Sequence, residues 1–186
     1  MRVRPVGIVG FGCALAVAAA GCAGASDTQA SPPSTYQLAP QTVRPDETAL
    51  KLPPALDGLT QFTVIGYTSV ASLVGSHAEM QSVQGKFVRL RLVVVNTDRS
   101  TTELNTDKNL LLTATGATYA PDNQAMSIKR QPRTLELGAN VRVEFDLYYD
   151  VPADTKPTGL RLFGGVSLAD PTDEQGVEIQ LGLPGS

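Results

Sequence analysis

The chain has few of the residues on which disulfides, metal centres and catalytic sites depend. Its 186 residues include two cysteines, one histidine and no tryptophan. Both cysteines, Cys13 and Cys22, fall near the N-terminus, so the remainder of the chain can form neither a disulfide nor a cysteine-based zinc site. A Ser-His-Asp hydrolase would have to use His77, but Ser76 beside it lacks the G-x-S-x-G motif of a nucleophile elbow. We therefore predict a protein that is not an enzyme, with no catalytic residue and no cofactor.

Positive charge is also scarce. The sequence has 15 Lys and Arg against 18 Asp and Glu, a formal net charge of −3. Nucleic-acid-binding domains usually have the opposite balance, so we expect no nucleic-acid partner. The acidic residues Asp170, Asp173 and Glu174 lack the ordered spacing of a calcium loop. They predict an acidic turn and no metal site.

The N-terminus has the organisation of an export signal. Arg2 and Arg4 precede Val6–Ala20, an uncharged run that is shorter than the roughly 20 residues of a membrane-spanning helix. The following Ala19-Ala20-Gly21-Cys22 resembles the lipobox of bacterial lipoproteins, with Ala19 where that motif prefers Leu. The resemblance implies that residues 1–21 are a signal peptide and that the Cys22 sulfur carries a diacylglyceryl group.

A lipid on Cys22 predicts a protein attached to the outer, extracytoplasmic face of the cell membrane. Two acyl chains are enough for stable attachment, whereas one chain is marginal. The alternative is an ordinary secreted protein cut after Ala25, and partial secretion is also compatible with the pattern.

Residues 22–58 have the composition of a tether. Six of the 13 prolines fall between residues 23 and 58, Ser, Thr, Ala and Gln fill much of the rest, and no period of 2 or 3.6 is visible. Such a segment cannot bury enough apolar surface to offset the entropy cost of ordering it. We expect a disordered tether over residues 22–58, followed by a folded domain over residues 59–186.

The folded domain shows the period-2 pattern of antiparallel strands. In the segment 140–150, Val143 and Phe145 share one face while Glu144 and Asp146 share the other, and the pattern predicts that only the apolar face is buried. Similar segments are 61–68, 85–96, 109–115, 159–166 and 176–181. About seven short strands separated by Gly, Pro, Asp and Asn predict an all-β, antiparallel β-sandwich. Its expected core includes Leu90, Leu92, Val143, Phe145 and Ile179.

Four motifs in fixed order carry a family resemblance over residues 60–182. They are Gly85-Lys86-Phe87-Val88 leading to Val95-Asn96-Thr97, Leu135-Glu136-Leu137-Gly138, Asp150-Val151-Pro152 and Leu160-Arg161-Leu162. They resemble an immunoglobulin-like (telokin-like) domain of unknown function that occurs in Gram-positive and actinobacterial lipoproteins, a group that is similar to a secreted mycobacterial antigen family. The resemblance implies an immunoglobulin-like fold and an extracytoplasmic location, and it brings no catalytic residues.

The segment 120–134 is long for a sandwich loop, and long loops on rigid sandwiches often bind partners. It combines the cations Lys129, Arg130 and Arg133 with the apolar residues Met126 and Ile128. A basic patch on an acidic chain attracts anionic partners, here an envelope protein, an anionic lipid or a wall polymer. The alternative is an irregular edge strand with solvated charges.

These observations favour a cell-envelope lipoprotein that presents a non-catalytic binding domain outside the membrane. The alternative is a carrier of a small ligand or lipid with its pocket between the sheets. A hydrolase would require His77 to be buried beside a serine and an acid. Tyr119, Tyr148 and Phe163 are the candidate surface aromatics, too few to predict a sugar site. The sequence predicts no oligomeric state.

Overall fold

The longest strand pairs form where the alternation in the sequence is most regular. The computed structural model describes residues 43–166 and 171–183. The first sheet consists of β1 (Thr48–Ala49), β2 (Ala55–Asp57), β3 (Thr60–Val70), β6 (Gly85–Asn96) and β11 (Arg142–Pro152). The central strand β6 pairs antiparallel with β11 on one side and with β3 on the other, and β1 and β2 add to the outer edge of β3.

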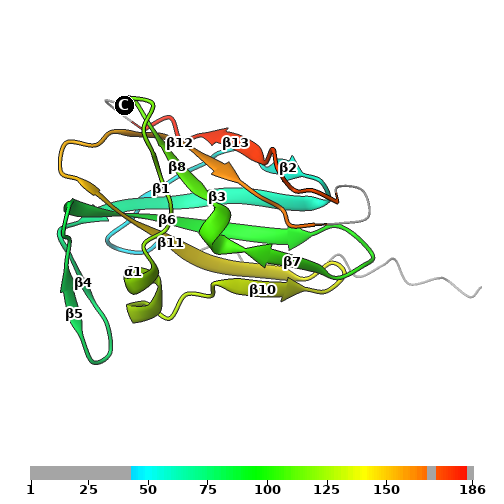
Figure 1. Ribbon diagram of the computed structural model, residues 1–186, viewed down its shortest axis with the longest axis horizontal. Coiled ribbons are helices and arrows are strands. Elements are labelled where there is room, and N and C mark those ends of the chain that lie inside the picture. Colours follow the sequence, from blue (N-terminus) through cyan, green and yellow to red (C-terminus); the bar gives the residue numbers. More distant parts are fainter. Residues whose placement is uncertain (1–42, 167–170, 184–186) are drawn as a thin grey trace, which may run out of the picture. The chain divides into compact units, whose positions relative to one another are not determined.

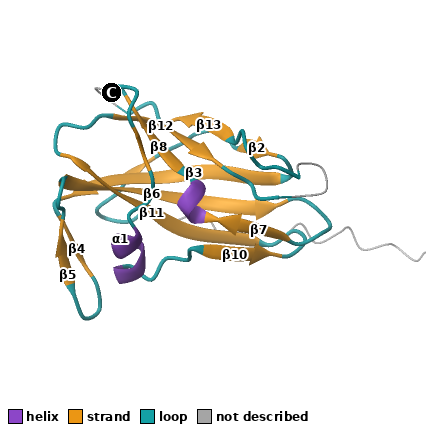
Figure 2. Ribbon diagram, viewed as in Figure 1, coloured by secondary structure: helices purple, strands orange, loops and turns teal. Residues whose placement is uncertain are grey.

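A second layer lies across this sheet (Figures 1 and 2). Its main sheet has the order β13-β12-β8-β9. Those strands are β8 (Leu110–Thr113), β9 (Thr118–Tyr119), β12 (Pro157–Leu162) and β13 (Val177–Gln180). Two further antiparallel pairs are β7 (Thr102–Asn105) with β10 (Thr134–Leu137), and the hairpin of β4 (Ser72–Val74) and β5 (Glu79–Gln81). The prediction of an all-β, antiparallel β-sandwich is confirmed, and the described residues form thirteen strands, most of them short.

Two short helices are the helical elements of the described residues. The 3-10 helix η1 (Thr106–Lys108) follows β7, and α1 (Asn123–Ile128) follows β9. Leu73 lies in strand β4. Within the described residues, no helix is long and apolar enough to cross a membrane.

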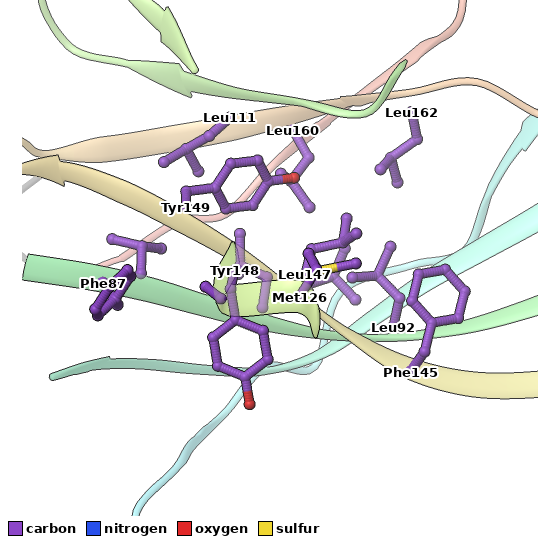
Figure 3. Close-up of a cluster of buried hydrophobic side chains, with 14 of the residues drawn as sticks. Phe87, Leu92, Leu111, Met126, Phe145, Leu147, Tyr148, Tyr149, Leu160 and Leu162 are labelled. Carbon is purple, nitrogen blue, oxygen red and sulfur yellow. The ribbon is translucent and has the colours of Figure 1, made fainter. Parts of the chain in front are cut away.

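The core lies between the two layers. Leu90 and Leu92 are fully buried, and Phe145 and Ile179 are 5% exposed, so these four core predictions are confirmed. Val143 is only partly buried at the edge of the cluster. Figure 3 shows Tyr149 pointing toward Leu111 and Leu160 of the second layer, while its neighbour Tyr148 points to the opposite side of β11.

The opposite side of the first sheet is also covered, and here the expectation of a solvent-exposed face is wrong. Arg89 and Arg91 of β6 are 9% and 5% exposed, and Asp146 and Tyr148 of β11 are 5% and 1% exposed. The period of 2 fixes which side chains share a face, but it does not say whether another segment covers that face.

The folded domain begins earlier than expected. Residues 43–58, predicted to belong to the tether, contribute β1 and β2 and place Leu50 and Leu52 against the core. The boundary at residue 59 is therefore too late. The predicted signal peptide, Cys22 and the tether up to residue 42 lie outside the described residues.

Phe145→Ala is expected to lower the free energy of unfolding by about 3–5 kcal/mol, because it empties a large buried site between the layers. Chemical denaturation followed by circular dichroism measures this loss. Val141→Ala is the matched control, since Val141 is 41% exposed just before the same strand and its truncation should change stability by less than about 0.5 kcal/mol. Equal stability of the two variants would contradict the core assignment.

Candidate functional site

The predicted binding segment 120–134 contains helix α1. Asp122 caps the helix, since its side chain accepts a hydrogen bond of 2.7 Å from the Ala125 backbone N–H. The structure corrects one expectation for this segment: Met126 is fully buried in the core and is not an exposed contact residue. Ile128 is partly buried against the same cluster. Of the five predicted contact residues, Arg130 and Arg133 are exposed, Ile128 and Lys129 are partly exposed, and Met126 is buried.

The segment around α1 covers the free edge of β11. The Asp122 backbone N–H donates to the Tyr148 carbonyl oxygen at 2.7 Å, and the Asp146 backbone N–H donates to Oε1 of Gln131 at 2.8 Å. An uncovered edge strand exposes unpaired backbone groups to other chains. The segment therefore has a structural role along β11, and its two ends are held in place by that strand.

The end of α1 packs on the β4–β5 hairpin, which projects from the body in Figure 1. A side chain at Gly75 would collide with Ile128, so the hairpin turn lies directly against the helix. Lys129 Nζ donates to the Val74 carbonyl oxygen at 3.0 Å, and Arg130 donates to the Ser76 hydroxyl at 2.9 Å. Two of the predicted cations therefore meet the hairpin.

We call this surface the basic tip, defined by Lys129, Arg130, Val74, Ser76 and His77. A pocket of about 220 Å³ lies between the helix and the hairpin turn, and Arg130, Ser76 and His77 are among the residues that line it. Val74 is 66% exposed. The hairpin also carries Glu79, whose carboxylate accepts a hydrogen bond from Gln81. The basic tip thus combines two cations with an exposed apolar side chain.

Arg130 has an unusual backbone conformation for its residue type. Its φ is 53°, in the left-handed region that favours glycine, and the other two non-glycine residues of this kind in the described ranges are Asn140 and Asp173. The Arg130 N–H bonds to the Ser127 carbonyl oxygen and the Gln131 N–H bonds to that of Met126, which is a Schellman helix end. Glycine usually occupies this position. An arginine here costs roughly 1–2 kcal/mol in backbone energy.

The third predicted cation, Arg133, does not belong to the basic tip. Its guanidinium bonds to the carboxylate of Asp107 in η1, and Nε lies 2.9 Å from Oδ2. The structure therefore brings Lys129 and Arg130 together and separates Arg133 from them.

His77, the only histidine, is exposed in the hairpin turn. The hydroxyl of the adjacent Ser76 accepts its bond from Arg130. These two side chains therefore do not form the buried pair that a hydrolase would require. In the acidic turn, Asp173 pairs with Lys108 at 2.8 Å, and Asp170 lies outside the described residues. Within the described ranges, no three His, Cys, Asp or Glu residues form a group able to hold a metal ion.

A charged segment that the sequence analysis missed covers the outer face of the first sheet. We call residues 43–49 the strap. Its Glu47 side chain is fully buried, with Oε1 at 2.6 Å from Arg91 and Oε2 at 3.4 Å from Arg89. A side chain at Gly66 would collide with the Glu47 carboxylate, so this glycine provides the space beneath it. Arg89 and Arg91 therefore face a carboxylate instead of water.

The neighbours of Glu47 tie the strap to three strands. Arg44 bonds to Asp146 of β11 at 2.7 Å, and Asp46 pairs with Arg89 of β6 at 3.2 Å. The Thr68 hydroxyl of β3 donates to the Asp46 carbonyl oxygen at 2.6 Å. The sequence signal was the cluster of charges formed by Arg44, Asp46 and Glu47 inside a proline-rich stretch. Its two carboxylates are opposite in charge to Arg89 and Arg91.

The pKa values of this cluster follow its charges. Burial acts to raise the pKa of Asp46, but the hydrogen bond from Arg89 and a backbone hydrogen bond outweigh it, and the pKa lies below its ordinary value. Burial, and then the negative charge of Asp146, raise the pKa of Tyr148 to about 12. A carboxyl group whose pKa is lower in the folded state than in the unfolded state stabilises the fold at pH values above its ordinary pKa. The contribution of Asp46 to stability is therefore lost as the pH falls through its lowered pKa.

Comparisons with known proteins agree with the fold and name no activity. A family model described as a domain of unknown function (DUF4352) matches residues 54–172. A conserved hypothetical protein from Bacillus anthracis is 13% identical, with 73% of this chain and 97% of that chain covered and a TM-score of 0.52. The yjhA protein from Bacillus subtilis is 12% identical, covering 69% and 93%, with a TM-score of 0.50.

A secreted protein from Mycobacterium tuberculosis, MPT63, is 16% identical and covers 64% of this chain and 88% of its own. Its TM-score of 0.35 is too low to bear on the fold. No curated protein matches the sequence. The Bacillus structures support the same β-sandwich architecture.

Glu47→Gln is expected to lower the free energy of unfolding by about 3 kcal/mol, because it leaves two nearly buried guanidinium groups without their shared charge. Hydrogen exchange should become faster in residues 43–49. Glu178→Gln is the matched control: it removes the same charge from an exposed pair with Arg161, and it should cost at most about 1 kcal/mol. If the hydrogen exchange of residues 43–49 is equally slow in both variants, Glu47 does not hold the strap.

Proposed function

We propose that the chain, which belongs to the DUF4352 family, is a cell-envelope lipoprotein whose domain binds an anionic partner through the basic tip. The lipid on Cys22 attaches the chain to the outer face of the membrane, and the domain acts by binding without catalysis. The membrane surface itself is the anionic partner that such an anchor brings nearest. Acidic wall polymers and acidic envelope proteins are the competing partners.

The observation that carries this proposal is the charge of the basic tip. Lys129 and Arg130 end a helix beside a projecting hairpin, on a chain whose net charge is −3. Each cation near an anionic lipid surface is worth about 1 kcal/mol of binding free energy. The exposed side chain of Val74 adds apolar surface that can be buried at the boundary between lipid headgroups and acyl chains.

The backbone of Arg130 supports the same assignment. A residue in an unfavourable conformation persists only where the surrounding structure or a function requires it. Glycine would satisfy the helix end at lower backbone energy, and the Arg130 side chain makes a single exposed hydrogen bond, to Ser76. We infer that the side chain is retained for contact with a partner.

The packing of the core weighs against the carrier alternative. That function needs a cavity between the sheets, where Phe62 is fully buried, as are Phe87, Leu160 and Tyr149 (Figure 3). Pockets among the described residues are lined instead by loops and strand ends and, at Arg89 and Tyr148, by the outer face of the first sheet. An interaction domain needs no interior cavity.

Mass spectrometry of the mature protein tests the anchor. We expect an N-terminus at Cys22 with a diacylglyceryl group, because the preceding residues resemble a lipobox. Cys22→Ser should release the protein from the membrane fraction or leave an unprocessed precursor. An unmodified chain that begins at Ser26 would contradict the anchor.

Vesicle binding tests the basic tip independently of the anchor, with Cys22→Ser as the background. Lys129→Ser with Arg130→Gly should weaken binding to phosphatidylglycerol vesicles by about tenfold or more, since two cations are lost. Binding of the parent should fall as salt rises and be weak on phosphatidylcholine. Arg130→Gly alone should keep or raise stability, by up to about 1 kcal/mol, while weakening binding about fivefold.

Lys51→Ser with Arg99→Ser is the matched control, because both side chains are exposed and the loss of charge is the same. This variant should bind vesicles nearly as well as the parent. Equal losses in the two double variants would mean that net charge, and not the basic tip, governs binding. If the parent does not bind vesicles but binds acidic wall polymer, with an affinity that falls as salt rises, the partner is the polymer.

A further inference from the structure

A second cavity lies at the opposite end of α1 from the basic tip. It has a volume of about 510 Å³, within the range of small-ligand pockets. The β9 strand, the start of α1, the turn before β6 and Asp150 of β11 form its walls. The residues that matter here are Gln84, Tyr119, Asn123 and Gln124. Asn123 and Gln124 lie in the predicted binding segment 120–134 and Tyr119 was a candidate surface aromatic, but none of the four was among the five predicted contact residues.

Three side-chain amides face this cavity with their hydrogen-bonding capacity unused. Gln84, Asn123 and Gln124 are exposed, and their amide groups make no hydrogen bond to any described residue. Each amide offers two N–H donors and one carbonyl acceptor. Together they present a neutral, closely spaced set of donors and acceptors to whatever enters the cavity.

Two carboxylates fix the backbone segments that carry these amides. Asp150 accepts hydrogen bonds from the Ser82 hydroxyl at 2.5 Å and the Val83 N–H at 3.0 Å, which fixes the turn that carries Gln84. Asp122 caps α1 and so fixes Asn123 and Gln124. Both carboxylates line the cavity and no Lys or Arg does, so its charge disfavours an anionic ligand.

Tyr119 joins this cavity to another. Its half-buried side chain packs against the core, and it also lines a pocket of about 420 Å³ beside Thr115, Thr155 and Lys156. An aromatic face held in this way offers a flat apolar contact between two polar sites. Asp154 lines this second pocket beside Lys156, so its charges offset each other. An extended, uncharged ligand rich in hydroxyl groups would suit both pockets and match the amides.

From this geometry we propose that the two pockets around Tyr119 form a binding site for a neutral oligosaccharide, which we call the amide cleft. The amides of Gln84, Asn123 and Gln124 bond to sugar hydroxyls, and the Tyr119 ring packs against a sugar face. The amide cleft is separate from the basic tip and, unlike the basic tip, it disfavours an anionic ligand.

Isothermal titration calorimetry on the full chain tests the amide cleft. The probes are chitotetraose, maltotetraose and mannotetraose, with tetragalacturonate as the anionic comparison. We expect at least one neutral tetrasaccharide to bind and tetragalacturonate to bind at least about tenfold more weakly. Gln84→Ala, Asn123→Ala and Gln124→Ala combined should lower affinity by at least about tenfold, as the loss of several hydrogen bonds predicts.

Further variants test whether sugar binding is specific to the amide cleft. Tyr119→Leu keeps apolar bulk against the core while removing the aromatic face, and it should also weaken binding. Gln180→Ala removes an exposed amide from β13 and should leave affinity unchanged, as should the double variant of the basic tip. Retained binding in the triple amide variant, preference for tetragalacturonate, or no binding of any neutral tetrasaccharide at millimolar concentration would overturn the proposal. If a capped neutral peptide that pairs with the edge of β9 displaced the sugar, the cavity would be a peptide site, and this outcome would also overturn the proposal.

Discussion

The buried carboxylate of Glu47, between the guanidinium groups of Arg89 and Arg91, is the interaction on which the outer face of the first sheet depends. Two arginines on a central strand cannot be covered without a negative partner, because an unpaired buried charge is very costly. Glu144 of β11 also pairs with Arg91 at 3.0 Å, but Glu47 is the carboxylate that reaches both arginines, and Gly66 leaves the space that it needs. The strap, the cover of β6 and the start of the folded domain all follow from this contact.

The strap crosses the first sheet. Arg44 bonds to Asp146 of β11 and Asp46 pairs with Arg89 of β6, so its ion pairs reach from one strand to the next. The strap precedes the residues 54–172 that match the family, while Arg89 and Arg91 lie within them. The matched residues therefore include the two buried arginines but not the carboxylate of Glu47 that covers them.

The sequence predicted the elements whose stability comes from apolar burial. The period of 2 placed β6 at residues 85–96 and β11 within two residues of its bounds. It could not reveal the strap, whose stability comes from ion pairs within a proline-rich stretch. Helix α1 has six residues, too few to show a period of 3.6, and this is why Met126 was wrongly expected at the surface. The cations Lys129 and Arg130 were found because exposed charges in a long segment need no knowledge of the fold.

One short helix links the two candidate sites. Its first residues, Asn123 and Gln124, line the amide cleft, and the residues after its last turn, Lys129 and Arg130, form the basic tip. A helix of this length is unstable alone, so tertiary contacts must fix it. Met126 provides the buried contact in its middle, while Asp122 and Gln131 bind the edge of β11 at either end. The burial of Met126 therefore sets the orientation of both sites, which is a more demanding role than a surface contact.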